Sequence, residues 1–226
     1  MPTPRYAFTL LELLVVISII AVLAALLMPA LGLMKAAAAG VRCGNSLRQF
    51  AIADLTYADA WDQQIVPRFI NDAAGVRITP QGLWFANPDF VAALDSVDPV
   101  PCVPRRMFCS AARPPATWSA PSQLGLVYGM NYDLVPTSAV PFFVATLPLA
   151  RVSHQSEVIF AADGIDWQIA RVNVGLYNGG EGQAATGAYQ LATAFRHRAR
   201  ANASHLDGHL ESLTLADLGS ANRWNP

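Results

Sequence analysis

The side chains best suited to chemistry gather near the C-terminus. Fifteen residues hold three histidines and two carboxylates, namely His197, His205, Asp207, His209 and Glu211. Imidazole and carboxylate groups are common zinc ligands. Because side chains alternate along a strand, His205 and Asp207 would share one face and His209 would lie beyond a turn. No cysteine follows in this part of the sequence to complete a tetrahedral set. The spacing therefore predicts no metal site and no cofactor.

His197 and Asp207 are predicted instead to be structural partners. Nine residues separate them, which is enough for a turn and a short strand that returns the carboxylate toward the imidazole. Asp207-Gly208 is a dipeptide typical of hairpin turns, where Gly208 supplies the positive φ. The Asp207 carboxylate would then accept hydrogen bonds from the turn backbone or from His197.

No pattern typical of an enzyme or of a nucleic-acid-binding protein is found in the sequence. A Gly-x-Ser-x-Gly nucleophile elbow is absent, and Ser204 and His205 would point to opposite faces of a strand. The 15 Lys and Arg against 16 Asp and Glu give a formal net charge of −1, which is no electrostatic footprint for DNA or RNA. We expect neither catalysis nor a nucleic-acid partner.

Three cysteines are candidates for a disulfide: Cys43, Cys102 and Cys109. The odd number leaves one thiol over. Cys102 and Cys109 are close in sequence, and the pairing stays open at this point.

The N-terminal part of the chain is apolar on every side. Leu13 to Leu33 are 21 residues without a charge, long enough to cross the roughly 30 Å hydrocarbon core of a bilayer as a helix. A core helix of a soluble protein would show a polar face, and a secretory signal has an apolar core of only about 7–15 residues. A cleaved signal ending at Ala36–Ala39 and an ordinary anchor are the weaker alternatives to a specialised membrane span.

Glu12 is the charge that directly precedes this run. An ionised carboxylate near mid-bilayer costs on the order of 2–3 kcal/mol. Glu12 therefore needs a partner or a position near the interface.

Beyond Leu33 the sequence favours a continuing helix with one apolar face. Strong helix formers are followed by apolar residues at three-to-four spacing, and the helix is expected to end near Trp61. Residues 62–150 are rich in proline and predict loops and short elements. Farther on, Val158–Ala162 reads as a strand followed by an Asp163-Gly164 turn, and residues 203–213 read as a hairpin. The sequence thus predicts an α+β fold, with a long N-terminal α-helix packed on a small antiparallel β-sheet.

The segment Ala7-Phe8-Thr9-Leu10-Leu11-Glu12, with the apolar run behind it, resembles the start of a type IV prepilin or type II secretion pseudopilin. The resemblance implies that a prepilin peptidase cuts between Ala7 and Phe8 and methylates the new amine. It also implies assembly roles for Glu12, as the fifth mature residue, and for Pro29. Ala7 departs from the family, in which glycine is usual at this position.

Later segments resemble a subgroup of these proteins with a C-terminal His, nine residues, then Asp-Gly. The matching residues are His197, Asp207 and Gly208, and weaker likenesses surround Cys43, Cys109 and Tyr128-Gly129-Met130-Asn131-Tyr132. Cys43 and Cys109 are the two cysteines within these matching pieces.

The resemblance implies residues 1–7 as leader peptide, 8–33 as transmembrane and filament-core helix, 34–62 as the outer half of the helix, and 63–226 as a globular β-rich pilin-like domain. It implies a single-pass protein of the bacterial inner membrane, with its C-terminal domain in the periplasm or on the cell surface. The implied partners are prepilin peptidase, other pilin-like subunits in a helical filament, the inner-membrane assembly platform and, before assembly, the lipid bilayer. The alternative is a membrane-anchored periplasmic binding or enzymatic domain with a prepilin-like anchor.

Overall fold

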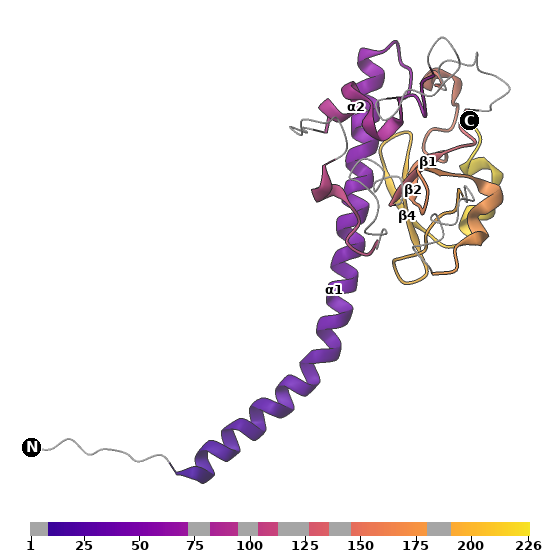
Figure 1. The fold of residues 1–226 in the computed structure, drawn as a ribbon. Coiled ribbons are helices and arrows are strands. Elements are labelled where there is room, and N and C mark those ends of the chain that lie inside the picture. Colours follow the sequence, from indigo (N-terminus) through magenta and orange to yellow (C-terminus); the bar gives the residue numbers. More distant parts are fainter. Residues whose placement is uncertain (1–8, 72–81, 95–103, 113–126, 136–145, 180–190) are drawn as a thin grey trace, which may run out of the picture. The chain divides into compact units, whose positions relative to one another are not determined.

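The computed structural model describes residues 9–71, 82–94, 104–112, 127–135, 146–179 and 191–226 (Figure 1). The chain forms two compact units, residues 1–38 and residues 39–226. Helix α1 (Leu10–Ala60) runs through both units. Residues 39–226 are called the outer unit below.

Helix α1 is continuous from Leu10 to Ala60 and ends one residue before the predicted position. It includes Pro29, whose ring removes one backbone donor from the helix interior. After the helix, Asp62 (φ 48°) and Gln63 (φ 58°) adopt left-handed conformations. The Gln63 N–H donates to the Ala58 carbonyl at 2.8 Å, which satisfies one of the last carbonyls and turns the chain away.

The outer unit contains a five-stranded mixed sheet with strand order β3-β1-β2-β4-β5. The strands are β1 (Tyr128–Asn131), β2 (Ile159–Asp163), β3 (Gln168–Ile169), β4 (Ala201–His205) and β5 (Leu210–Leu213). The shorter helices are η1 (Trp84–Ala86), α2 (Pro88–Ala92), η2 (Arg105–Met107), η4 (Leu149–Arg151), η5 (Arg171–Leu176), η7 (Asp217–Gly219) and η8 (Ala221–Arg223). The predicted α+β fold is confirmed.

One edge of the sheet differs from the prediction, because β3 pairs with β1 in parallel while the other three pairs are antiparallel. The turn predicted at Asp163-Gly164 does not join two neighbouring strands, because β1 lies between β2 and β3 in the sheet. Gly129 permits the close contact between these two strands. A Cβ at Gly129 would lie 2.6 Å from Ile169 Cγ2 and 2.7 Å from the Gln168 backbone carbon. Only glycine lets β1 and β3 approach this closely.

The predicted C-terminal hairpin is present. Strands β4 and β5 pair antiparallel, with Ser204 opposite Leu210. Gly208 has φ +90°, and its N–H donates to the His205 carbonyl at 3.0 Å. Glycine adopts this φ without steric cost, as a tight hairpin requires.

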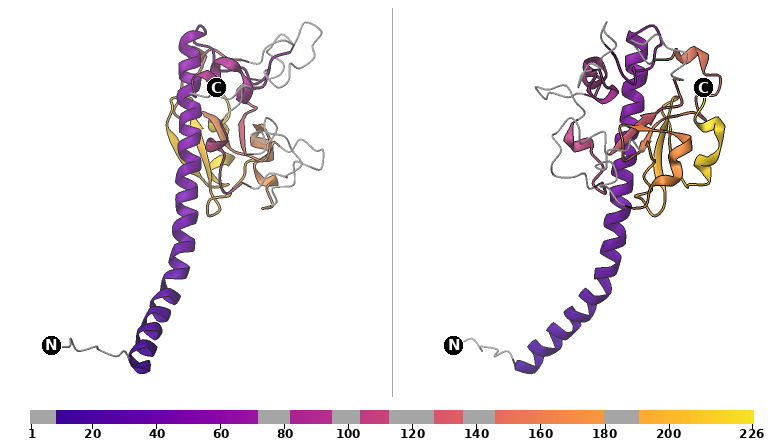
Figure 2. Two further views of the ribbon diagram at one scale, coloured as in Figure 1. Left: turned by 60° about the vertical axis from the view of Figure 1, so that its left-hand side comes forward. Right: turned by 45° about the vertical axis from the view of Figure 1, so that its right-hand side comes forward.

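The main core lies between residues 43–58 of α1 and one face of the sheet (Figure 2). Trp84 occupies its centre, with ring centroids 5.9 Å from Phe50, 5.8 Å from Phe90 and 6.4 Å from Phe160. Its indole N–H donates to the Trp167 carbonyl at 2.8 Å, so the polar atom of this buried ring is paired. A smaller cluster packs elsewhere on the sheet and includes Ile159, Ala162, Ala203, Leu213, Leu218 and Trp224.

A buried carboxylate fixes the chain where it leaves α1. Asp54 is 1% exposed, and its Oδ1 accepts a hydrogen bond from the Val66 N–H at 2.6 Å. Burial raises the pKa of Asp54 to about 7, against a smaller opposing effect of the Val66 bond.

Candidate functional site

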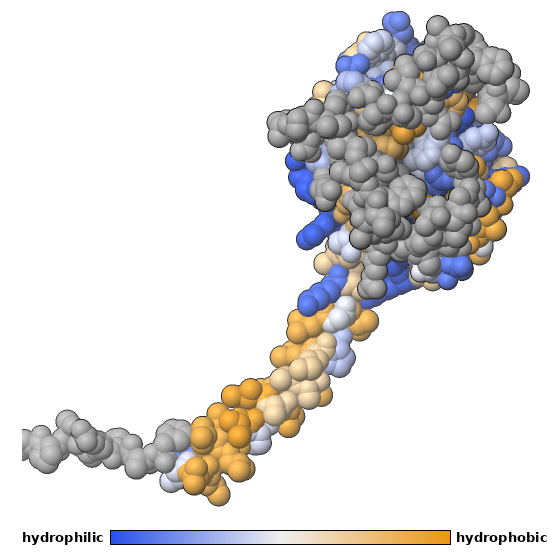
Figure 3. All heavy atoms as spheres, viewed as in Figure 1, coloured by the Kyte–Doolittle hydropathy of each residue, from blue (hydrophilic) through white to orange (hydrophobic). Residues whose placement is uncertain are grey.

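The first part of α1 exposes an unusually large apolar surface. Large apolar side chains from Leu10 to Met34 are exposed in the single chain, and Figure 3 shows this part of the helix as mostly orange and pale orange. Within the described part of the chain, α1 is the helix long and apolar enough to cross a membrane. A soluble monomer rarely exposes so much contiguous apolar surface, which indicates contact with lipid or with other helices.

Glu12 forms a reciprocal capping box with Thr9 at the start of α1. Its Oε2 accepts from the Thr9 N–H and from the Thr9 hydroxyl, both at 2.9 Å. In return, the Glu12 N–H donates to Thr9 Oγ1 at 3.2 Å. The Thr-x-x-Glu spacing is a known helix-start signature that identifies this role. The carboxylate therefore has partners within its own helix.

The predicted cleavage position, between Ala7 and Phe8, lies outside the described residues. A model of the prokaryotic N-terminal methylation motif matches residues 4–28, which includes both positions, Glu12 and the start of the apolar helix. The motif supports a type IV pilin-like protein. It also supports processing of a pilin-like precursor by prepilin peptidase, and the apolar helix is consistent with a membrane anchor. No curated protein and no solved structure matches the chain. The matched motif ends at Met28, before the C-terminal His and Asp-Gly residues.

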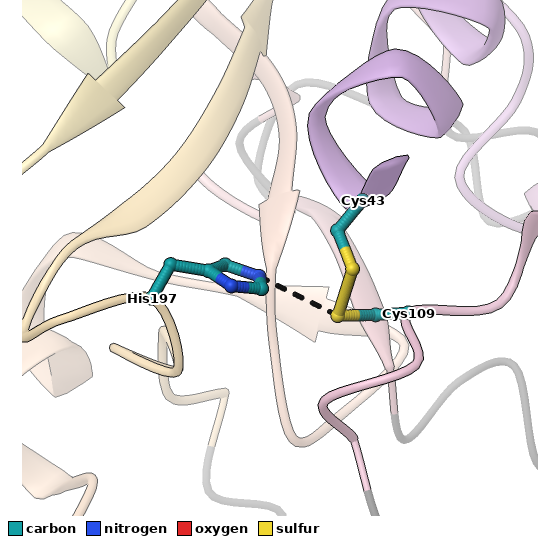
Figure 4. A group of neighbouring side chains, drawn as sticks. All are labelled: Cys43, Cys109 and His197. Atoms are coloured by element: carbon teal, nitrogen blue, oxygen red, sulfur yellow. Dashed lines mark hydrogen bonds between the residues drawn. A yellow bond between two sulfur atoms is a disulfide. The ribbon is translucent and has the colours of Figure 1, made fainter. Parts of the chain in front are cut away.

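A disulfide between Cys43 and Cys109 joins α1 to the segment after η2 (Figure 4). The two cysteines are 66 residues apart in sequence, and Cys43 is the first buried residue of α1. Both cysteines lie in the segments that resemble the subgroup of pilin-like proteins described above. Cys102, the third candidate, lies outside the described residues.

His197 lies beside this disulfide and not beside Asp207. Its Nε2 is 3.4 Å from Cys109 Sγ and 3.5 Å from Asp163 Oδ2 (Figure 4 shows the sulfur contact). Asp163 is fully buried, and its Oδ2 also accepts from the Asn202 N–H at 2.8 Å. The predicted pairing of His197 with Asp207 is thus wrong. Asp163, which was interpreted as a turn residue, is the carboxylate that His197 faces.

Asp207 has the other predicted role, in the turn. Its Oδ1 accepts from the His209 N–H at 3.1 Å and lies 2.7 Å from His209 Nδ1. These contacts, with the left-handed Gly208, fix the β4–β5 turn. The prediction that the Asp207 carboxylate accepts from the turn backbone is confirmed.

Replacing His197 by alanine is expected to lower the free energy of unfolding of the outer unit by about 1–3 kcal/mol, because the buried Asp163 carboxylate loses a polar neighbour. Denaturant titration of the detergent-solubilised chain, followed by tryptophan fluorescence, measures the effect, since all five tryptophans lie beyond residue 60. His154→Ala is the control, because the ring of His154 bonds the adjacent Ser153. Equal stability of the two variants would contradict the prediction.

The hairpin also brings His209 close to His205, although the sequence predicted that His209 would lie beyond the turn and away from it. His205 and His209 stack with ring centroids 4.0 Å apart, and His205 Nε2 is 3.8 Å from Glu211 Oε2. Burial, with a smaller contribution from His209, lowers the pKa of His205 to about 4, so its ring is neutral at neutral pH.

Strand register is the signal that would have found this cluster. With Ser204 opposite Leu210 and Ala203 opposite Glu211, His205 falls opposite His209. Ala203, His205, His209 and Glu211 then share one face of the hairpin. The sequence prediction considered only the alternation along one strand. It did not include the pairing of residues after the turn with those before it, which places His209 opposite His205.

Proposed function

We propose that this chain is a structural, non-enzymatic subunit of a type II secretion pseudopilus or of a type IV pilus-like filament. The observation that carries the proposal is the match to the methylation motif over residues 4–28, at the start of a helix that is apolar on all sides and exposed in the single chain. A prepilin-type N-terminus accounts together for Ala7-Phe8, for Glu12 and for the uniform apolar run.

In the proposed mechanism, the apolar part of α1 holds the subunit in the bacterial inner membrane, and the outer unit lies in the periplasm. During assembly, the inner-membrane platform extracts the subunit, and helices of neighbouring subunits replace lipid as the apolar environment. The same apolar surface of α1 that contacts lipid tails in the membrane can then pack against the apolar helices of neighbouring subunits.

Glu12 is the polar group that this environment must accommodate. Before assembly its carboxylate is satisfied by Thr9. In the filament we assign it a second partner, the methylated amine of Phe8 on a neighbouring subunit. Such a pair would specify register, because a misplaced subunit leaves a buried charge without compensation.

We also place the chain in the subgroup with a C-terminal His, nine residues, then Asp-Gly. The local roles of these residues support this assignment, since His197 lies against the disulfide and Asp207-Gly208 forms the hairpin turn.

Processing provides the direct test. Coexpression with an active prepilin peptidase is expected to yield a mature chain that begins at Phe8 and carries one added methyl group, as measured by mass spectrometry. Cells without the peptidase provide the control, and Ala7→Gly is expected to be cut at least as efficiently. An intact Met1 terminus in the presence of the peptidase, or cleavage after Ala39, would contradict the proposal.

Substitution of Glu12 tests the assembly step. Glu12→Ala is expected to insert into the membrane normally and to enter filaments poorly, as measured by fractionation and by recovery of sheared filaments. Glu12→Gln is the matched control for helix capping, because glutamine at this position can still accept from Thr9. We expect both variants to fail in assembly. Normal assembly of Glu12→Gln would assign the carboxylate to capping alone.

A further inference from the structure

The C-terminal hairpin of the outer unit carries a cluster of potential metal ligands that the proposed function does not use. His205, His209 and Glu211 each offer one ligand atom, and these atoms lie within 4.8 Å of one another. His205 ends β4, Glu211 belongs to β5, and His209 is in the turn between them. The hairpin backbone therefore fixes the positions from which all three side chains start.

His205 is the strongest indication that a ligand is bound here. Its side chain is fully buried, and among the described residues neither ring nitrogen has a hydrogen-bond partner. Leaving a buried polar group unpaired costs free energy, so native structures rarely do so without a reason. A bound cation would satisfy one nitrogen directly.

His209 is held as metal-ligating histidines commonly are. Its Nδ1 lies 2.7 Å from Asp207 Oδ1, which leaves Nε2 as the ring nitrogen available to a ligand. A carboxylate behind a ligating imidazole fixes its tautomer and raises its basicity. The Asp-Gly turn thus contributes to the cluster as well as to the hairpin.

Glu211 contributes the negative charge. Its Oε2 is 2.6 Å from Arg223 Nη1 and 3.8 Å from His205 Nε2, and its Oε1 is 3.4 Å from Arg223 Nη2. Arg223 competes for this carboxylate, yet a carboxylate has two oxygens and about four lone-pair sites. Oε2 keeps a second lone pair besides the one that accepts from Arg223 Nη1, and this lone pair can bind a cation.

We propose that His205, His209 and Glu211 bind a divalent transition-metal ion of the zinc class. Two imidazole nitrogens and one carboxylate oxygen are a donor set used for zinc, with water in the fourth position. The same set is poorly suited to calcium or magnesium, which prefer oxygen ligands. The ion would join β4 to β5, which is an edge strand of the sheet.

Binding requires one local movement. The two imidazole planes are parallel, at an interplanar angle of 0°, so their nitrogen lone pairs do not converge as a tetrahedral ion requires. The His209 side chain is 42% exposed and the His205 side chain is 0% exposed. We therefore expect His209 to tilt while His205 stays in place.

The test uses the full chain in detergent with an affinity tag that contains no histidine. After treatment with chelator, isothermal titration with zinc sulfate is expected to show one zinc ion per chain. Zinc at about 100 times its dissociation constant should raise the melting temperature by roughly 5–10 °C. Cobalt in place of zinc should give the visible absorption of a tetrahedral site.

Variants decide the outcome. His209→Ala and Glu211→Gln alter partly exposed side chains and should fold, and both are expected to abolish stoichiometric binding and the cobalt spectrum. Asp207→Asn should weaken binding by about 10–100-fold. His154→Ala is the matched control and should bind as the unmodified chain does. No stoichiometric binding by the unmodified chain, or binding that survives both His209→Ala and Glu211→Gln, would overturn the proposal.

Discussion

A chain in which Cys43 and Cys109 are both replaced by serine is expected to lose about 4 kcal/mol of unfolding free energy, the value that the chain-entropy model gives for a loop of this length. The disulfide closes a 66-residue separation, and both cysteines are buried. The loss is measured by denaturant titration in detergent, followed by tryptophan fluorescence. It should exceed the loss caused by His197→Ala, which removes a single polar neighbour and no crosslink.

Two controls separate the crosslink from the loss of a sulfur atom. Cys102→Ser is expected to leave the denaturation midpoint unchanged. Addition of a thiol reductant to the unmodified chain should lower its midpoint to near that of the double variant and should not affect the double variant. If the unmodified chain unfolds at the same denaturant concentration with and without reductant, the disulfide does not carry this stability.

The second large effect is the dependence of stability on pH through Asp54. Its pKa is raised from 3.8 to about 7 in the folded outer unit, so between these pH values the folded state holds a proton that the unfolded state has lost. Stability from this group is complete below pH 3.8 and is lost as pH rises through 7. A shift of this size corresponds to about 4 kcal/mol between the two limits.

Asp54→Asn isolates this contribution, because the amide oxygen can still accept the Val66 hydrogen bond without an ionisable group. We expect the variant to be more stable than the unmodified chain at about pH 8 and to differ little from it at about pH 4. The difference between the two chains is the readout, because His205, whose pKa is lowered from 6.5 to about 4, changes stability in the opposite direction below pH 6.5. Exposed Asp59 on the same helix provides the control variant, Asp59→Asn. A stability difference that does not change with pH would contradict the prediction.

The sequence predicted elements whose signals are local. Helix α1 followed from helix-forming residues and from apolar spacing, and the hairpin of β4 and β5 followed from Asp207-Gly208 between alternating strands. Strand β3 was missed because its parallel pairing depends on contact between segments far apart in sequence. Gly129 permits this contact, but no residue pattern within β3 itself indicates the pairing.

The site residues were predicted less well, for a related reason. Distance along the chain suggested Asp207 as the partner of His197, whereas the fold brings Asp163 on β2 to that histidine. The Asp163-Gly164 dipeptide has the composition of a turn, and only the burial of β2 distinguishes its role. The capping role of Glu12 is readable from the Thr9-x-x-Glu12 spacing.

The position of Cys43 has a mechanical consequence. Cys43 is the first buried residue of α1, so a pull applied along the helix from its N-terminal end reaches this residue before the aromatic contacts of Phe50 and Trp84. The covalent bond to Cys109 then carries part of the load into the segment after η2, on a different part of the outer unit. Non-covalent packing would resist such tension only until the helix slid past its neighbours. With the crosslink intact, a pulling force should be shared between α1 and the segment after η2, and chains pulled under oxidising conditions should yield at higher force than reduced ones.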